Sequence, residues 1–197
     1  MTVANFFTLL RIFISPIFPF LYLQYEWLGI PFVYLPYIML ALLLICECSD
    51  LFDGLLARRW NQVTDLGKIL DPMADTVTHI SLFITFTQGV VQMPLSFVFV
   101  FLYRELFVGA LRTLCALKGI ALAARFSGKV KAVMQAVVCT LILSLMIPYA
   151  EGLISLTMLQ TLSFYLTAIA AVYTVISVGD YVYANRTYIR KSFQNPA

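Results

Sequence analysis

Long runs of apolar residues, separated by short polar turns, extend along the whole chain. A transmembrane helix needs about 20 consecutive, mostly apolar residues to cross the hydrocarbon core of a bilayer. The pattern predicts six such helices, which would make the chain an all-α integral membrane protein. The six predicted spans run near Ile12–Leu28, Phe32–Ala57, Gly67–Gly89, Pro94–Leu117, Val130–Pro148 and Leu153–Ala184.

The first residues have a different pattern. Asn5 and Thr8 are polar positions among phenylalanine and leucine residues, so Thr2–Leu10 is predicted to be a short helix at the membrane interface. Pro16 and Pro19 fall early in the first span and are expected to loosen its first turns, because proline lacks a backbone donor. The first cation comes late and no cleavage pattern follows, so this span is expected to be retained.

Composition agrees with a membrane protein. Apolar residues make up 61% of the 197 residues and charged residues 12%, against about 25% charged in ordinary soluble domains. The mean hydropathy is +0.90, and a chain of this length cannot bury so much apolar surface in a water-soluble core. No repeat or change of composition divides the chain, so residues 1–197 are predicted to form one domain. No basic run with interleaved aromatic residues suggests a nucleic-acid partner.

Lysine and arginine residues fall almost entirely on one side of the predicted spans. The loops on the other side, near Glu26–Pro31, Gly89–Met93 and Pro148–Gly152, contain neither residue type. The positive-inside rule therefore predicts that both termini and the basic turns face the cytoplasm. The cations on that side are Arg11, Arg58, Arg59, Lys68, Lys118, Arg125, Lys129, Lys131, Arg186, Arg190 and Lys191.

Aspartates are concentrated around the turn between the second and third predicted spans. Asp50, Asp53, Asp65, Asp71 and Asp75 lie within 26 residues, although a carboxylate in mid-membrane costs roughly 2.5–3.5 kcal/mol. Asp65 falls in the turn itself and could cap the third span. The other four need a common explanation.

Helical spacing predicts where these four carboxylates lie. Asp50 and Asp53 share one face of the second span, and Asp71 and Asp75 are one turn apart on the third. The linking segment is short, so the two spans are predicted to pack antiparallel with the carboxylates facing one another. Their repulsion would require either cations between them or protonation of some of the carboxylates. All-oxygen ligands favour Mg²⁺ or Mn²⁺ as the cations. Two such ions would neutralise the cluster, and the lack of a cysteine–histidine ligand set argues against zinc.

These residues form a motif that resembles the CDP-alcohol phosphotransferase family. The family pattern is D-x-x-D-G-x-x-A-R, eight residues, then G-x-x-x-D-x-x-x-D. The chain reads Asp50-Leu-Phe-Asp53-Gly54-Leu-Leu-Ala57-Arg58, eight residues, then Gly67-Lys-Ile-Leu-Asp71-Pro-Met-Ala-Asp75. Every defining position matches at the family's spacing.

The resemblance implies a six-helix membrane enzyme, usually a homodimer, that transfers a substituted phosphate from a CDP-linked donor to an alcohol and releases CMP. It implies that Asp50, Asp53, Asp71 and Asp75 hold two divalent metal ions, and that Asp75 is also the general base for the acceptor hydroxyl. The motif positions that it assigns to the CDP site are Gly54, Ala57, Arg58 and Gly67.

Within the family, the sequence most resembles the bacterial phosphatidylglycerophosphate synthases, which join CDP-diacylglycerol and sn-glycerol 3-phosphate. The shared features are the stretch 57–62, the run 70–75, the opening Asn5-x-x-Thr8-x-x-Arg11, the pair Arg104-Glu105 and the run 128–131. This resemblance adds Asn5 and Thr8 to the CDP site and implies a location in the inner (cytoplasmic) membrane. CDP-dependent cardiolipin synthases are the alternative, followed by family members that use serine or inositol phosphate.

A phosphorylated acceptor needs cations near its phosphate. Arg112, Arg125, Lys129 and Lys131 stand at the cytoplasmic ends of the fourth and fifth spans and are predicted to bind the phosphate of glycerol 3-phosphate. Simple positive-inside topology would explain the same residues equally well.

Five further polar positions stand out. Arg104 and Glu105 are adjacent in the fourth span, so they are not expected to face each other, and each is predicted to pair across helices or to line the cavity. Thr76 stands where relatives often have a lysine. Glu47, one turn before the motif, could tune the site, pair within a dimer or bind a polar partner. His79, one turn after it, could orient the last aspartate or satisfy another polar group.

Two other classes of function fit the acidic cluster less well. A divalent-cation carrier would use intramembrane carboxylates, but the motif aspartates all lie at one end of the membrane. An inactive relative, kept as a lipid-binding or assembly protein, would have no reason to retain four costly aspartates. The sequence therefore predicts a metal-dependent phosphatidyltransferase.

Overall fold

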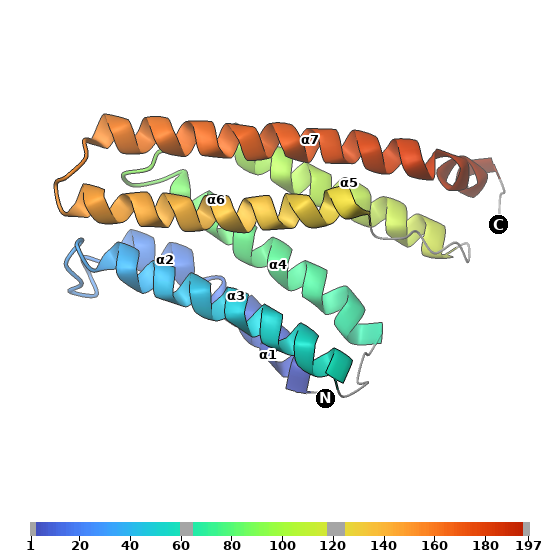
Figure 1. Ribbon diagram of the computed structural model, residues 1–197, viewed down its shortest axis with the longest axis horizontal. Helices are drawn as coiled ribbons and strands as arrows, with labels where there is room; N and C mark the ends of the chain where they lie inside the picture. Colours follow the sequence, from blue (N-terminus) through green and yellow to red (C-terminus); the bar gives the residue numbers. More distant parts are fainter. Residues whose placement is uncertain (1–2, 60–64, 118–124, 195–197) are drawn as a thin grey trace. The chain divides into compact units, whose positions relative to one another are not determined.

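The computed structural model describes the backbone of residues 3–59, 65–117 and 125–194, and the side chains of residues 8–49, 70, 72–117 and 125–190. Every regular element in these ranges is an α-helix (Figure 1), which confirms the predicted all-α class. The helices are α1 Val3–Ile14, α2 Ile17–Gln24, α3 Leu35–Arg59, α4 Asp65–Phe86, α5 Leu95–Leu117, α6 Phe126–Ala150 and α7 Leu156–Gln194.

Helices α3 to α7 follow the predicted apolar runs, and most of their ends lie close to the predicted ones. α7 continues beyond the predicted end at Ala184 to Gln194. The residues after Ala184 are mostly polar or basic and include no proline or glycine before Gln194, so nothing in the local sequence stops the helix.

The N-terminal segment differs from its prediction. The sequence suggested a short helix at Thr2–Leu10 followed by a span from Ile12, but α1 continues through Arg11 to Ile14. The interruption falls at Ser15 and Pro16 instead. The Ser15 backbone N–H still bonds to the Arg11 carbonyl at 2.9 Å, whereas Pro16 has no N–H to extend the ladder. The predicted boundary was therefore too early by one turn.

The length and composition of two helices in the described residues would allow them to cross a membrane: Phe126–Ala150 and Leu156–Arg190. Thr8–Gln24 and Leu35–Ser49 are shorter apolar helical stretches. α5 has the length of a span but carries Arg104, Glu105 and Arg112. The six-span topology stays a prediction.

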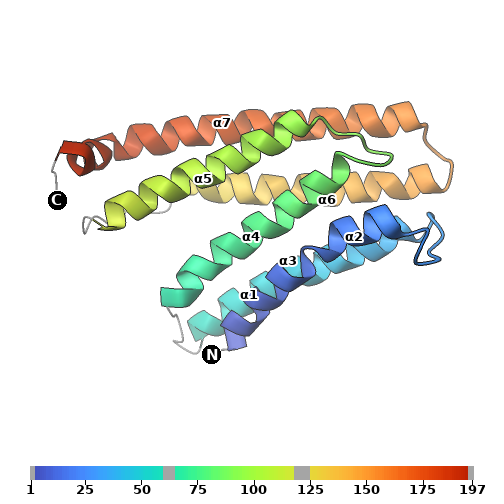
Figure 2. The same cartoon turned by 180° about the vertical axis from the view of Figure 1, so that it is seen from behind.

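The chain divides into two compact units: Met1–Met93 with Cys139–Phe164, and Pro94–Val138 with Tyr165–Ala197. In the first unit, α1 packs against both α3 and α4, and these are the most extensive contacts among helices α1 to α4. Figure 2 shows α1 and α2 alongside α3. The sequence had suggested direct packing between α3 and α4, and among the described side chains Glu47 of α3 and His79 of α4 make such a contact. Whether residues 1–197 form one domain stays a prediction.

The loop after α4 depends on a glycine that touches Tyr22. Gly89 has a φ of 62°, and a Cβ added there would lie 2.6 Å from Tyr22 Cε1. The Tyr22 hydroxyl in turn donates to the Gln88 carbonyl and accepts from the Val90 N–H, both at 3.2 Å. Gly89 therefore leaves room for the Tyr22 side chain, whose hydrogen bonds connect α2 to the end of α4.

Replacing Gly89 with alanine should destabilise the protein, since the backbone conformation alone costs of order 1–3 kcal/mol for a residue with a side chain. Displacement of Tyr22 should add to this loss. Gly29→Ala is the matched control, because Gly29 has a φ of 67° and no atom within 4 Å of an added Cβ. The melting temperature in detergent should fall further for Gly89→Ala. Equal losses would contradict a role for the Tyr22 contact.

Candidate functional site

The motif residues lie in the C-terminal half of α3 and the N-terminal half of α4, the helix that follows it in the sequence. The α3 backbone is helical through Asp50, Asp53 and the positions Gly54, Ala57 and Arg58, and α4 is helical from Asp65 through Gly67, Asp71 and Asp75. The expected helical registers are therefore present. Among these residues only Asp75 has a described side chain, so the metal set Asp50, Asp53, Asp71 and Asp75 stays a prediction. The CDP set also stays a prediction; of its members Asn5, Thr8, Gly54, Ala57, Arg58 and Gly67, only Thr8 has a described side chain, which is buried in α1.

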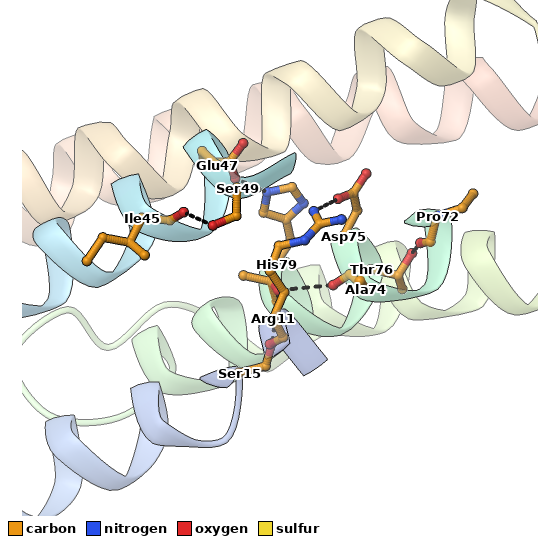
Figure 3. A network of polar contacts seen from close by, with 11 residues as sticks. Arg11, Ser15, Ile45, Glu47, Ser49, Pro72, Ala74, Asp75, Thr76 and His79 are labelled. Atoms are coloured by element: carbon orange, nitrogen blue, oxygen red, sulfur yellow. Dashed lines mark hydrogen bonds and ion pairs between the residues drawn. The ribbon is translucent and has the colours of Figure 1, made fainter. Parts of the chain in front are cut away.

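Asp75 is held by Arg11, which the sequence analysis placed on the cytoplasmic side and in the shared opening motif but did not assign to the site. Nη1 of Arg11 in α1 donates to Oδ1 of Asp75 at 2.7 Å (Figure 3). The Arg11 side chain is 4% exposed and the Asp75 side chain 35% exposed. The arginine is thus embedded in protein while the carboxylate keeps an open side. The sequence did contain one indication that Arg11 is paired, because a cation inside an apolar helical run needs a partner.

A second polar contact joins Ser15, the residue after α1, to α4 one turn further along. Ser15 Oγ lies 2.9 Å from Thr78 Oγ1, and both residues are buried. Ser15 Oγ also lies 2.8 Å from the Arg11 carbonyl oxygen, and Thr78 Oγ1 lies 3.0 Å from the Ala74 carbonyl oxygen. Each hydroxyl has one hydrogen to donate, so two of these three contacts are hydrogen bonds at any one time. The contacts bring the backbone at Arg11 close to the backbone immediately before Asp75.

Glu47 and His79 bind each other across α3 and α4. His79 Nε2 lies 3.2 Å from Glu47 Oε1, and the histidine ring is 6% exposed. This contact selects between the earlier alternatives: His79 satisfies another polar group, and Glu47 has a polar partner within its own chain. Figure 3 shows the pair beside the Arg11–Asp75 contact.

Thr76, which stands where relatives often have lysine, bonds to its own helix. Its hydroxyl donates to the Pro72 carbonyl at 2.8 Å. Pro72 lies inside α4 and lacks a backbone N–H. The described contact of Thr76 is therefore local, and it supplies no positive charge next to Asp75.

A divalent ion fits the chemistry of the motif. The four motif side chains offer only carboxylate oxygens, the donors that Mg²⁺ and Mn²⁺ prefer. The one described carboxylate, Asp75, is partly exposed and so accessible to a ligand. Within the described residues there is no group of three or more His, Cys, Asp or Glu side chains that could hold a metal.

A buried polar network occupies the second unit. Arg104 Nη1 donates to both oxygens of Glu105 at 3.0 Å, and Lys131 of α6 binds Glu105 Oε1. The expected pairing across helices is confirmed for Glu105. The expectation that Arg104 and Glu105 would not face each other was wrong, because the long arginine side chain bends back to its neighbour. A Cβ on Gly128 would lie 3.2 Å from Arg104 Nη2, so this glycine leaves room for the guanidinium.

The other predicted acceptor residues have varied surroundings. Arg125 binds Asp180 of α7 through Nε and Nη2, both at 3.1 Å, and Ser127 Oγ donates to the same carboxylate at 2.6 Å. Lys129 is exposed. The Arg112 guanidinium lies 5.5 Å from the centre of the Tyr181 ring. The sequence analysis did not predict that Asp180 binds Arg125. The only indication in the sequence was an aspartate directly after a glycine in an apolar helical run.

Comparison with known proteins gives a consistent result. Residues 1–176 match the family model described as CDP-alcohol phosphatidyltransferase. A relative from Salmonella choleraesuis, named CDP-diacylglycerol–glycerol-3-phosphate 3-phosphatidyltransferase, is 34% identical over 139 residues, which cover 68% of this chain and 73% of its own length. The protein of that name from Escherichia coli is 33% identical over 139 residues with the same coverage. The one from Pectobacterium atrosepticum is 41% identical over 73 residues, 37% of this chain and 38% of its own.

Proposed function

Since the chain belongs to the CDP-alcohol phosphatidyltransferase family, we propose that it transfers the phosphatidyl group of CDP-diacylglycerol to glycerol 3-phosphate. The products are phosphatidylglycerophosphate and CMP. The observation that carries this proposal is the similarity to relatives named for that reaction over 68% of the chain. The complete aspartate motif in α3 and α4 supports it.

The proposed chemistry assigns one task to each part of the motif. Asp50, Asp53, Asp71 and Asp75 hold two divalent ions, Mg²⁺ or Mn²⁺, which supply positive charge to the diphosphate of the donor. Asp75 also accepts the proton of the acceptor hydroxyl, whose oxygen forms the new bond to the phosphatidyl phosphorus. The bond from that phosphorus to the CMP oxygen breaks, and CMP leaves. Asn5, Thr8, Gly54, Ala57, Arg58 and Gly67 bind the CDP group.

We assign the phosphate of the acceptor to Arg112, Arg125, Lys129 and Lys131. Arg125 and Lys131 are paired with Asp180 and Glu105 in the ligand-free chain. Lys129 is exposed, and within the described residues it makes no ion pair. It is therefore the member of the set whose replacement should disturb the fold least.

Replacing Lys129 with alanine should raise the KM for glycerol 3-phosphate roughly tenfold, the loss expected for one charge-assisted hydrogen bond. The kcat should stay within about threefold, since the residue is not assigned to the chemical step. Arg186→Ala is the matched control, because Arg186 is an exposed cation whose guanidinium stacks on Tyr183 of its own helix. Unchanged acceptor KM in the Lys129 variant would remove it from the site.

The proposed location is the inner membrane, with six spans and with both termini in the cytoplasm, in a homodimer. Large apolar side chains stay exposed along α5 and α7, among them Phe99, Leu106, Ile169 and Val172. Such surfaces are stable when lipid covers them. The side opposite the basic turns carries no lysine or arginine in its loops, which supports the orientation.

The test of the function is an acceptor panel in membranes that contain the protein. CDP-diacylglycerol and Mg²⁺ are supplied with labelled glycerol 3-phosphate, phosphatidylglycerol, serine or inositol phosphate. Conversion of glycerol 3-phosphate alone, lost in EDTA and restored by Mg²⁺, is the expected result. Conversion of phosphatidylglycerol would instead indicate a cardiolipin synthase. No conversion of any acceptor by folded, metal-binding protein would contradict the proposed enzyme.

A further inference from the structure

We propose that Arg11 is a positioning residue for Asp75, so that helix α1, which also carries the proposed CDP-binding Asn5 and Thr8, holds the proposed base in place. This inference rests on the proposed function, in which Asp75 takes the proton of the acceptor. It goes beyond the motif in α3 and α4, because α1 carries none of the motif aspartates.

The amphipathicity of α1 is the reverse of what an interfacial helix would show. Such a helix turns its polar face to water and its apolar face to lipid. In α1 and the residue that follows it, Thr8, Arg11 and Ser15 are all buried, at 0%, 3% and 0% exposure, whereas Phe13 is 74% exposed. These three polar residues have the spacing of one helical face. The polar stripe of α1 therefore faces the protein, where α3 and α4 pack against this helix.

Arg11 and Asp75 have unequal exposure, which assigns them different roles. A guanidinium that is 4% exposed needs an anion, and Asp75 is its described partner at 2.7 Å. The carboxylate itself is 35% exposed. Arg11 engages Oδ1 from the protein side, so the carboxylate has a fixed rotation while its open side can meet a ligand or a proton.

The contact is fixed at two points. Besides the ion pair, the Ser15 and Thr78 hydroxyls lie 2.9 Å apart, and they also contact the carbonyls of Arg11 and of Ala74, the residue before Asp75. The backbone of α1 is thus linked to the backbone that carries Asp75, and the side chain of Arg11 is linked to the carboxylate (Figure 3). A group with both its backbone and its carboxylate held has few alternative rotamers, which is what a base needs to meet a substrate hydroxyl repeatedly.

The experiment compares Arg11→Gln and Arg11→Lys with wild type. Glutamine removes the charge but keeps a donor, and lysine keeps the charge on a compact ammonium in place of the planar guanidinium. For Arg11→Gln we expect kcat to fall roughly 100-fold, the cost of a misplaced catalytic group, with KM for CDP-diacylglycerol within about threefold. Arg11→Lys should recover about tenfold of the lost kcat, since a lysine ammonium can still reach the carboxylate as a point charge.

Tyr22→Phe is the matched structural control. Tyr22 is also buried and also joins the N-terminal helices to the α4 region, but it bonds to Gln88 and Val90 rather than to Asp75. It should lower the melting temperature while kcat stays within about threefold. If Arg11→Gln lowers kcat no more than Tyr22→Phe does at a comparable loss of melting temperature, Arg11 is only a structural residue and the inference is overturned.

A second measurement does not depend on turnover. Mn²⁺ affinity of the purified protein should become roughly tenfold tighter in Arg11→Gln, because a positive charge bound to a proposed ligand is removed. Arg11→Lys should keep the wild-type affinity. Unchanged or weaker Mn²⁺ binding in Arg11→Gln would overturn the inference. Failure of the proposed function would give a different result, because the wild-type protein would then convert no acceptor. The Mn²⁺ comparison would still decide whether Arg11 acts on Asp75.

Discussion

Replacing Asp75 with asparagine should lower kcat for phosphatidyl transfer by at least about 1,000-fold. The loss combines two effects, because the variant lacks the general base and one carboxylate of the proposed metal set. Asparagine is the informative replacement. Its amide oxygen can still accept a hydrogen bond from Arg11 Nη1, which is 2.7 Å from Asp75 Oδ1 in the wild type. The buried guanidinium therefore keeps a polar partner, and the loss of activity can be separated from a loss of fold.

Asp65→Asn is the control for this prediction. Asp65 belongs to the same acidic stretch and opens α4, but it is not one of the four motif aspartates, and asparagine caps helices as well as aspartate does. Activity should stay within about threefold of wild type. Initial rates with CDP-diacylglycerol, Mg²⁺ and glycerol 3-phosphate give the comparison, with the melting temperature of each variant. An Asp75→Asn protein that keeps a tenth of wild-type activity would remove Asp75 as the base.

The helices themselves were largely predictable from the sequence. Apolar runs with polar turns indicate where helices begin and end, and the ranges for α3 to α6 agree closely with the structure, whereas α7 continues past its predicted end at Ala184 to Gln194. The N-terminal boundary failed because polarity and backbone geometry gave different positions. Asn5 and Thr8 suggested an early end to the first helix, but a helix stops where the backbone cannot continue, which here is at Pro16.

The polar partners were much less predictable. Arg11 with Asp75 and Arg125 with Asp180 join residues 64 and 55 positions apart, so no local periodicity connects them. Their pairing depends on how each helix is rotated about its axis against its neighbours. The sequence did indicate that buried charges in apolar helices need partners, and it correctly predicted a cross-helix partner for Glu105. It could not identify Lys131 as that partner.

The largest effect on stability is expected at Glu105. This one carboxylate binds both Arg104 and Lys131, whose side chains are 7% and 6% exposed. Glu105→Ala would leave two buried cations without their shared anion. Removing one partner of a buried ion pair typically costs about 3–5 kcal/mol, and the loss here should lie at the upper end. Thermal unfolding of the detergent-purified protein measures it.

Lys131→Met distinguishes this explanation from a simple loss of contacts. That variant removes one cation but leaves Glu105 paired with Arg104 at 3.0 Å, so no charge is left without a counter-charge. Methionine also fills much of the space of the lysine stem. Its destabilisation should therefore be clearly smaller than that of Glu105→Ala, although the lysine is more deeply buried than the glutamate.

The double variant completes the argument. If loss of the shared anion is the cause, adding Lys131→Met to Glu105→Ala should restore part of the lost stability, because one of the two cations that Glu105 bound is then gone. If the two contacts merely add packing, the double variant should be less stable than either single one. Arg125→Gln, which breaks an exposed pair with Asp180, should shift the melting temperature little. Opposite signs of the Lys131→Met effect in the two backgrounds would show that charge balance, and not contact area, holds α5 against α6.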